Sequence, residues 1–230
     1  MNTNLIAVAF LRVKFLETIA VEILKFFNSI VGNYGLAIIL TTLLIKALLF
    51  PVTLKQEKSM QMMKELQPEI DEIQKKYKGD KAKINEMTAQ LYREKNVNPF
   101  SSCLPLIIQL PIFVALYYAF MSSEIPQTAT FLWFNLKKPD ALFVIHNFSI
   151  NILPIISSLL MIVQQKLMTP TSKNKENGEN AMQSAMLMMP IMMLFIFYKF
   201  PSGLNLYYVI NTAISILIQI YVMKKVRNNE

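Results

Sequence analysis

The chain alternates long apolar runs with polar and charged stretches. Five runs are long and apolar enough to cross the hydrocarbon core of a bilayer, which takes about 20 helical residues. They lie at 35–54, 102–121, 152–168, 182–199 and 204–223. Because lipid offers no hydrogen-bonding partner to exposed backbone groups, segments that span it must be helical. The pattern therefore predicts an all-α integral membrane protein with five transmembrane helices.

A different helical pattern precedes the first span, within residues 1–34. Between positions 15 and 30, apolar side chains recur every three or four residues, and polar side chains take the opposite side. The apolar positions are Leu16, Ile19, Ile23, Phe26 and Ile30. A helix with one apolar and one polar face is suited to lie in the membrane interface. We expect an N-terminal amphipathic interfacial helix on the outer side, with packing against the bundle as the alternative.

Residues 55–98 form the one clearly water-soluble segment. Gly79 is expected to end a first helix and Asp80 to cap a second, whereas Pro68 should kink the first helix or mark its restart. The pattern predicts a helical hairpin with one apolar seam. The seam positions follow helical spacing and are Met63, Leu66, Ile70, Ile73, Tyr77, Ile84, Met87 and Leu91.

This hairpin is longer than a connection between neighbouring helices needs to be. We therefore predict that it recruits partners through a surface that includes Glu65, Pro68, Tyr77 and Asp80. A charged hairpin that only joins two spans is the alternative.

The distribution of Lys and Arg predicts the orientation in the membrane. Ten lie in 55–98, three in 166–183 and three after position 223, against two in the loop 122–151. Cationic loops stay in the cytosol during insertion. We therefore place the N-terminus outside, the C-terminal tail 224–230 inside, and the loop 169–181 inside. The net charge of +8 is then mainly a topology signal, with attraction to anionic lipid or ribosomal RNA secondary.

One charge interrupts the apolar pattern. Lys46 lies nine residues before Lys55, roughly 13 Å from the cytosolic end of its helix at 1.5 Å per residue. A lysine exposed to lipid at this depth costs on the order of 2.5 to 3.5 kcal/mol on insertion scales. The five spans contain no Asp or Glu, so an ion pair within them is not available. Lys46 should therefore face water or neutral polar groups.

Neutral polar residues occur on the other spans at helical spacings. Together they predict a hydrophilic groove around Lys46, although hydrogen bonds that join the helices are the alternative for each of them. The predicted groove residues besides Lys46 are Thr42, Gln109, Gln165, Tyr208, Asn211 and Ser215.

The chain lacks the residues for common enzyme chemistry. Cys103 is its only cysteine, and His146, expected to be an interfacial residue of the outer loop, its only histidine. There is no HExxH or GxSxG motif. We expect no enzyme, no metal and no cofactor. A small anion transporter or channel remains as the alternative function, against which stand the missing internal repeats and the missing intramembrane acid.

Several motifs follow one another along most of the chain: "VGNYG", "TTLLIKALLFPVTLKQ", "ELQPEI", "NPFSSCLPLIIQLPIFVALYYAF", "QQKLMTP" and "FPSGLNLYY". In this order they resemble the YidC/Oxa/Alb family of membrane protein insertases, in its short bacterial form. The resemblance implies a five-helix core and a groove open to the cytosol and to lipid. We assign residues 99–121 to the segment of the second span, and residues 200–223 to a turn and the fifth span. Lys46 stands where the family usually has arginine, which keeps the charge but not the planar donor fork.

The same resemblance implies a function in the bacterial cytoplasmic (inner) membrane. Hydrophilic ends of nascent membrane proteins would enter the groove, drawn by Lys46, while their apolar segments pass into the bilayer. The expected partners are nascent substrates and lipid, and the protein is expected to act as a monomer. Participation of a Sec translocon, of the signal recognition particle pathway and of the ribosome is left open.

Overall fold

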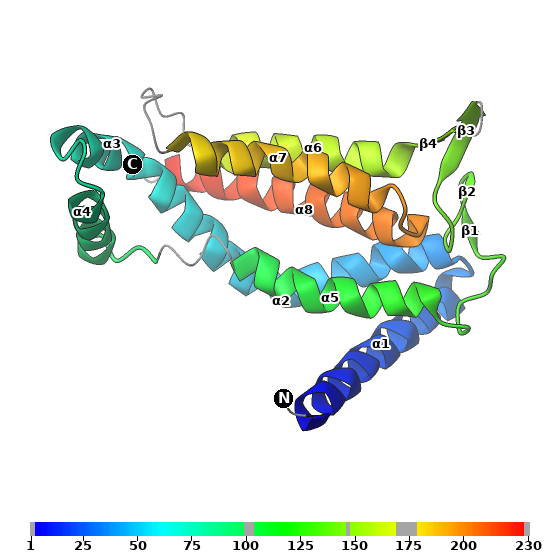
Figure 1. Cartoon of the computed structure of the whole chain (residues 1–230). Coiled ribbons are helices and arrows are strands. Elements are labelled where there is room, and N and C mark those ends of the chain that lie inside the picture. Colours follow the sequence, from blue (N-terminus) through cyan, green and yellow to red (C-terminus); the bar gives the residue numbers. More distant parts are fainter. Residues whose placement is uncertain (1–2, 99–103, 146–147, 169–178, 228–230) are drawn as a thin grey trace.

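Long helices make up most of the part of the chain that the computed structural model describes, which is residues 3–98, 104–145, 148–168 and 179–227. Helices α2 (Tyr34–Glu65), α5 (Leu104–Met121), α6 (Ile152–Met168), α7 (Glu179–Phe197) and α8 (Ser202–Arg227) run lengthwise through the molecule (Figure 1). Two short helices, α3 (Gln67–Lys76) and α4 (Lys81–Glu94), lie at one end, and four short strands lie at the other. Cys103 and His146 lie outside the described residues.

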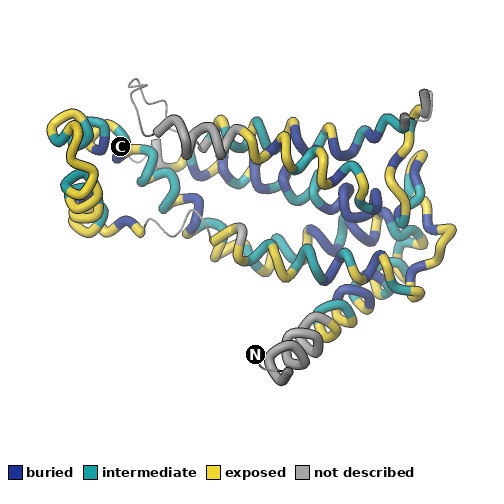
Figure 2. Tube along the Cα trace, viewed as in Figure 1, coloured by how far each residue is buried: buried dark blue, intermediate teal, exposed yellow. Residues whose placement is uncertain are grey.

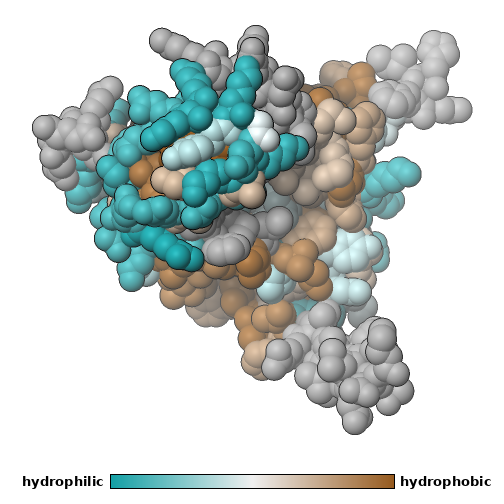
Figure 3. Space-filling model, turned by 60° about the vertical axis from the view of Figure 1, so that its left-hand side comes forward, coloured by the Kyte–Doolittle hydropathy of each residue, from teal (hydrophilic) through white to brown (hydrophobic). Residues whose placement is uncertain are grey.

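Two helical segments in this part of the chain have the length and hydropathy of a full membrane span, Tyr34–Glu65 and Ser202–Lys225. Three shorter apolar segments accompany them, Ile107–Met121, Ile152–Leu167 and Met188–Phe197. Apolar residues cover the sides of the helices, whereas hydrophilic residues gather over the end that carries α3 and α4 (Figure 3). Two of the five predicted windows thus coincide with helical segments that are long and apolar enough to cross a membrane, and the other three coincide with shorter apolar helices.

Helix α2 is longer than the sequence pattern indicated. It begins after Asn33, whose side-chain oxygen accepts hydrogen bonds from the backbone N–H groups of Gly35 and Leu36 at 2.8 and 3.2 Å. It then continues without interruption to Glu65, past the predicted span end at residue 54. Helix-favouring Lys, Gln, Glu and Met residues follow position 54, so nothing in the polar segment stops the helix. The first predicted arm of the hairpin is therefore partly an extension of α2.

The hairpin itself consists of α3 and α4. Pro68 stands in the first turn of α3, where proline is tolerated, and so marks a restart. Gly79 has φ +96°, and the Asp80 carboxylate accepts a hydrogen bond from the backbone N–H of Lys83 at 2.9 Å. Both local predictions are confirmed. The seam is formed by buried Leu66, Ile70, Leu91 and Val97, with Met63, Ile73 and Tyr92 packed against them; Tyr77, Ile84 and Met87, predicted to belong to it, are absent from this cluster.

The loop between α5 and α6 contains strands that the all-α prediction missed. β1 (Thr130–Phe131) pairs with β2 (Phe134–Asn135), and β3 (Ala141–Ile145) pairs with β4 (Phe148–Asn151), both antiparallel. Strands of two to five residues are too short to give a clear alternating pattern. The chain is thus mostly helical, with two small β-hairpins at one end.

The segment between β2 and β3 is hydrogen-bonded to the start of α8. The backbone N–H groups of Ser202 and Gly203 donate to the carbonyl oxygens of Lys138 and Leu136 at 2.8 and 2.9 Å. A Cβ at Gly203 would lie 2.6 Å from the Phe120 ring, so only glycine allows this approach. Figure 2 shows buried positions gathered along this region and exposed positions on α3 and α4. The largest buried side chains here are Tyr207, Phe120, Phe197, Ile125, Leu136 and Leu204.

Helix α1 (Thr3–Val31) packs against α2 and α5, which was the alternative to an interfacial position. Its buried face consists of Ala20, Val21 and Leu24, a different stripe from the predicted apolar one. Phe26 and Ile30 of the predicted stripe remain 60 and 63% exposed. Lys25 forms a salt bridge with Glu124 in the loop after α5. Leu24 is fully buried, and Leu16, which belongs to the predicted stripe, and Phe27 pack against the same core cluster.

Candidate substrate groove

Lys46 of α2 is half-buried and points to α8. Its ammonium group donates a hydrogen bond to the Ser215 hydroxyl at 2.6 Å, and that hydroxyl donates in turn to the Asn211 carbonyl at 2.9 Å. Because the hydroxyl hydrogen is used by Asn211, a lone pair of the Ser215 oxygen faces the ammonium. The structure thus brings together two predicted site residues that lie 169 positions apart. A neutral polar group holds the charge, as the sequence predicted.

The polar residues of α8 share one face. Tyr208, Asn211, Ser215 and Gln219 recur every three or four residues, so they line the same side of the helix. Tyr208 packs against the rings of Phe113 and Phe197, with centroids 6.0 and 4.5 Å apart. The polar strip therefore begins next to an aromatic cluster near the N-terminal end of α8 and continues into the C-terminal half of the helix.

Thr42 and Gln109 make internal contacts. Thr42 is fully buried, and its hydroxyl donates to the Ile38 carbonyl of its own helix at 2.7 Å. The Gln109 amide of α5 donates to the Tyr207 hydroxyl of α8 at 3.1 Å. The Gln109 hydrogen bond joins two helices, which is the alternative that the sequence left open, whereas the Thr42 hydrogen bond stays within α2. Gln165 lies half-buried on α6, which packs against α8.

Sequence reasoning missed an acid in this region. Glu57 is only 8% exposed and lies on the same helix as Lys46. The five predicted windows contain no Asp or Glu, as expected, but α2 continues beyond residue 54 and so includes Glu57. The signal was available: Glu57 follows Lys46 by eleven residues, which is three helical turns, so both lie on one face of α2.

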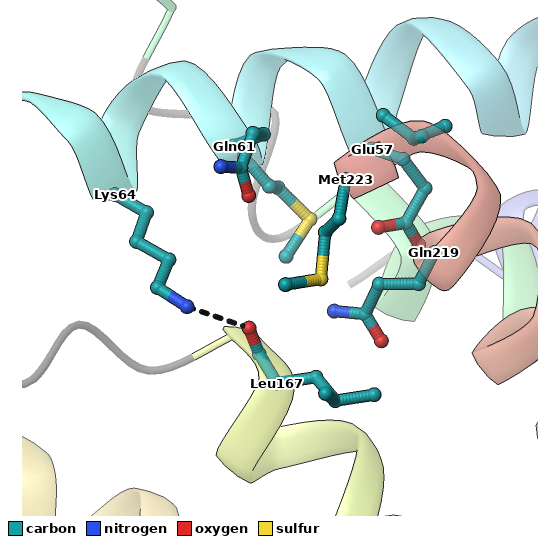
Figure 4. Close-up of a pocket in the computed structure, with 8 residues that line it drawn as sticks. Glu57, Gln61, Lys64, Leu167, Gln219 and Met223 are labelled. Carbon is teal, nitrogen blue, oxygen red and sulfur yellow. Dashed lines mark hydrogen bonds between the residues drawn. The ribbon is translucent and has the colours of Figure 1, made fainter. Parts of the chain in front are cut away.

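Glu57 lines a small cavity, ≈ 10 Å³, between the ends of α2, α6 and α8. Figure 4 shows its carboxylate beside Gln219, with Met223 close by. On the same wall, the Lys64 ammonium donates to the Leu167 carbonyl at the end of α6, at 3.1 Å. The cavity lies at the end of the bundle that carries the hairpin.

The predicted recruitment residues have local structural roles. Glu65 ends α2 and accepts a hydrogen bond from Gln61 at 3.0 Å, and Tyr77 ends α3. Pro68 and Asp80 begin the two short helices. Three of the four are exposed, and Tyr77 is half-buried. Within the described ranges, no three His, Cys, Asp or Glu side chains are grouped as a metal site would require.

Comparison with known proteins places this arrangement in one family. The model of the family described as "60Kd inner membrane protein" matches residues 26–229. The chain belongs to this family, that of the YidC/Oxa insertases. A membrane protein insertase YidC from Fusobacterium nucleatum is 44% identical over 198 residues, which cover 86% of this chain and 90% of that protein.

Other relatives are longer. The membrane protein insertase YidC of Magnetococcus marinus is 40% identical over 93% of this chain, which corresponds to 36% of its own length. A crystal structure described as active YidC insertase with the first transmembrane domain resolved is 33% identical and superimposes with a TM-score of 0.68. That match covers 89% of this chain and 45% of the solved one. The chain thus spans most of one curated relative and less than half of these two.

Proposed function

We propose that this chain inserts nascent membrane proteins into the bacterial cytoplasmic membrane. The observation that carries the proposal is Lys46, a cation held by Ser215 in a polar strip between α2 and α8. A cation at this depth costs free energy on membrane insertion, and such a residue usually marks a site that binds a polar or charged ligand. Family membership and the named activity of the relatives support the same conclusion.

The proposed mechanism is physical and forms no covalent bond. An acidic or polar tail of the substrate enters the groove from the cytosol, where Lys46 and the polar residues of α8 replace part of its hydration. Its apolar segment meanwhile passes along α6 and α8 into lipid. Exposed apolar side chains on these helices support that path: Leu159, Val163 and Leu217. Burial of the apolar segment drives the process, and the groove lowers the barrier for the polar end.

The proposed topology has five spans, with the N-terminus outside and the C-terminus in the cytosol. The polar hairpin and the end of the groove with Glu57 then face the cytosol, and the β-hairpins with their aromatic core face outwards. We propose nascent membrane proteins and lipid as partners and a monomer as the acting form. A ribosome, the signal recognition particle pathway or a Sec translocon would deliver substrates at the hairpin side.

An insertion assay tests this function. The purified chain in liposomes should protect the acidic tail of a short single-span protein from added protease, more than empty liposomes do. The same liposomes should not release trapped chloride. Chloride release without tail protection would contradict the proposal and support the anion channel instead.

A further inference from the structure

Glu57 is a buried acid that the proposed mechanism leaves without a role. It lies on the same face of α2 as Lys46 and lines the cavity at the cytosolic end of the groove. Opposite it, Gln219 of α8 is 4% exposed. An acid in such a position requires a compensating charge or hydrogen bonds, because burial alone penalises the ionised form.

Two of the donors that line the cavity are engaged elsewhere. Lys64 donates to the Leu167 carbonyl, and the Gln61 amide donates to Glu65. In the part of the chain that the structure describes, no side chain donates a hydrogen bond to the Glu57 carboxylate, and the buried Gln219 Oε1 has no partner either. The Glu57 carboxylate and an amide whose carbonyl oxygen has no partner thus line the same cavity. The complementary ligand is a cation that carries N–H donors.

A side chain of the substrate fits this chemistry better than a metal ion. Mg²⁺ and Ca²⁺ take six or more oxygen ligands, and the described residues offer no cluster of three metal-binding side chains. A lysine or arginine needs only one or two acceptors. Met60 and Met223 line the cavity, and their flexible side chains can yield to a long apolar stem.

The spacing of Lys46 and Glu57 along α2 defines a pattern. Lys46 and Glu57 are separated by eleven residues, or about 16 Å along α2 at 1.5 Å per residue. An extended peptide covers that length in about five residues at 3.3 Å each. A substrate whose acid lies at Lys46 therefore presents, at Glu57, a residue about five positions nearer the cytosol.

We propose that Glu57, with the Gln219 carbonyl, is a specificity-determining site that binds a Lys or Arg of the substrate about five residues from the acid held by Lys46. The inference rests on the insertase function proposed above. The groove would then select substrates that carry two opposite charges about five residues apart.

The test uses the full chain in liposomes and a set of single-span substrates with one Asp in the tail. A single Lys is placed two, five or eight residues from the Asp, on either side of it, and tail protection is measured. With wild type, insertion should be on the order of tenfold more efficient at a spacing of five than at two or eight, the size of a well-placed charge pair. Glu57→Gln should abolish the preference, Glu57→Asp should keep most of it, and Glu57→Lys should transfer it to a substrate with Glu in place of Lys.

Glu17→Gln, on α1, is the matched control and should retain the preference. If Glu57→Lys does not fold, Glu57→Gln alone decides. Equal spacing profiles for wild type and Glu57→Gln would overturn the inference while leaving the insertase function in place. Failure of wild type to insert any substrate of the set would instead overturn the function itself.

Discussion

Lys46 carries a charge within a membrane span, where an unpartnered charge costs free energy. Its charge, more than its shape, should carry the function, because its partner is the single Ser215 hydroxyl, which can accept a hydrogen bond from an ammonium or a guanidinium group. We expect Lys46→Arg to retain insertion of an acidic-tailed substrate and Lys46→Ala to reduce it roughly tenfold, the effect of losing about 1.4 kcal/mol. Tail protection in liposomes measures both variants.

Ser215→Ala provides a graded comparison at the same place. It removes the hydrogen bond to the ammonium but leaves the charge, so its effect should lie between those of wild type and Lys46→Ala. Lys199→Ala, an exposed lysine outside the groove, is the control and should behave as wild type. Equal activity of Lys46→Ala and wild type would rule out the assigned role of the charge.

Asp140 allows a second prediction at this scale, on stability. It is fully buried in the loop between β2 and β3, and its carboxylate accepts a hydrogen bond from the Leu153 N–H in the first turn of α6, at 2.8 Å. Burial raises the pKa of the Asp140 carboxyl, while hydrogen bonds from the backbone N–H groups of Leu153 and Ile152 act in the opposite direction. A raised folded-state pKa favours the protonated form, so this contribution to stability is full below the unfolded pKa of about 3.9 and is lost as pH rises through the folded pKa.

Two variants separate the charge from the cap. Asp140→Ala should lower the unfolding midpoint of the detergent-purified protein, since loss of a helix cap costs about 1 kcal/mol. Asp140→Asn keeps an acceptor without the titration, so wild type should lose stability relative to it as pH rises above 4. Lys138→Ala, in the same loop, is the control. Parallel pH profiles for wild type and Asp140→Asn would mean that the carboxyl does not titrate as described.

At the scale of elements, the hairpin of α3 and α4 is separable from the bundle. Its seam closes on itself through Leu66, Ile70, Leu91 and Val97, and a salt bridge from Lys95 to Glu69 at 3.3 Å links its two ends. Removal of residues 67–95 should therefore leave the helices of the bundle folded. Starting after Glu65 also keeps α2 and its cavity intact.

We expect this deletion, bridged by a flexible Gly/Ser linker, to reduce insertion several-fold because the proposed docking surface is lost. Thermal unfolding and gel filtration in detergent show whether the bundle is intact, and tail protection measures function. A variant that restores the wild-type α3–α4 segment between the same linkers is the control. Full insertion by a folded deletion variant would leave the hairpin as a connector only.

At the scale of the whole molecule, the decisive property is the side of the membrane from which water and soluble reagents can enter the groove. The aromatic core around Phe120, Phe197 and Tyr207 closes one end, whereas the Glu57 cavity lies at the other. With Cys103 replaced by serine, single cysteines at Lys46, Gln165 and Ser215 should react with an impermeant thiol reagent from the cytosolic side only. Thr42→Cys should stay unlabelled from both sides, since Thr42 is fully buried. Labelling from both sides would indicate a continuous pore.

The sequence by itself determined the features whose energetics are local. Twenty apolar residues in a row require a helix in lipid whatever surrounds them, and the restart at Pro68 and the cap at Asp80 depend on a few neighbouring residues. Lys46 stood out for the same reason, because the penalty for its charge does not depend on knowing its partner.

Only the tertiary structure decided which side chains meet. Ser215 was one of several polar residues at suitable spacing, and its contact with Lys46 depends on how α8 packs against α2. The buried face of α1, which consists of Ala20, Val21 and Leu24, depends on how α1 packs against α2 and α5. The short outer strands and the burial of Glu57 likewise depend on distant segments. Contacts of this kind join residues far apart in the chain, and their free energy appears only when the helices come together.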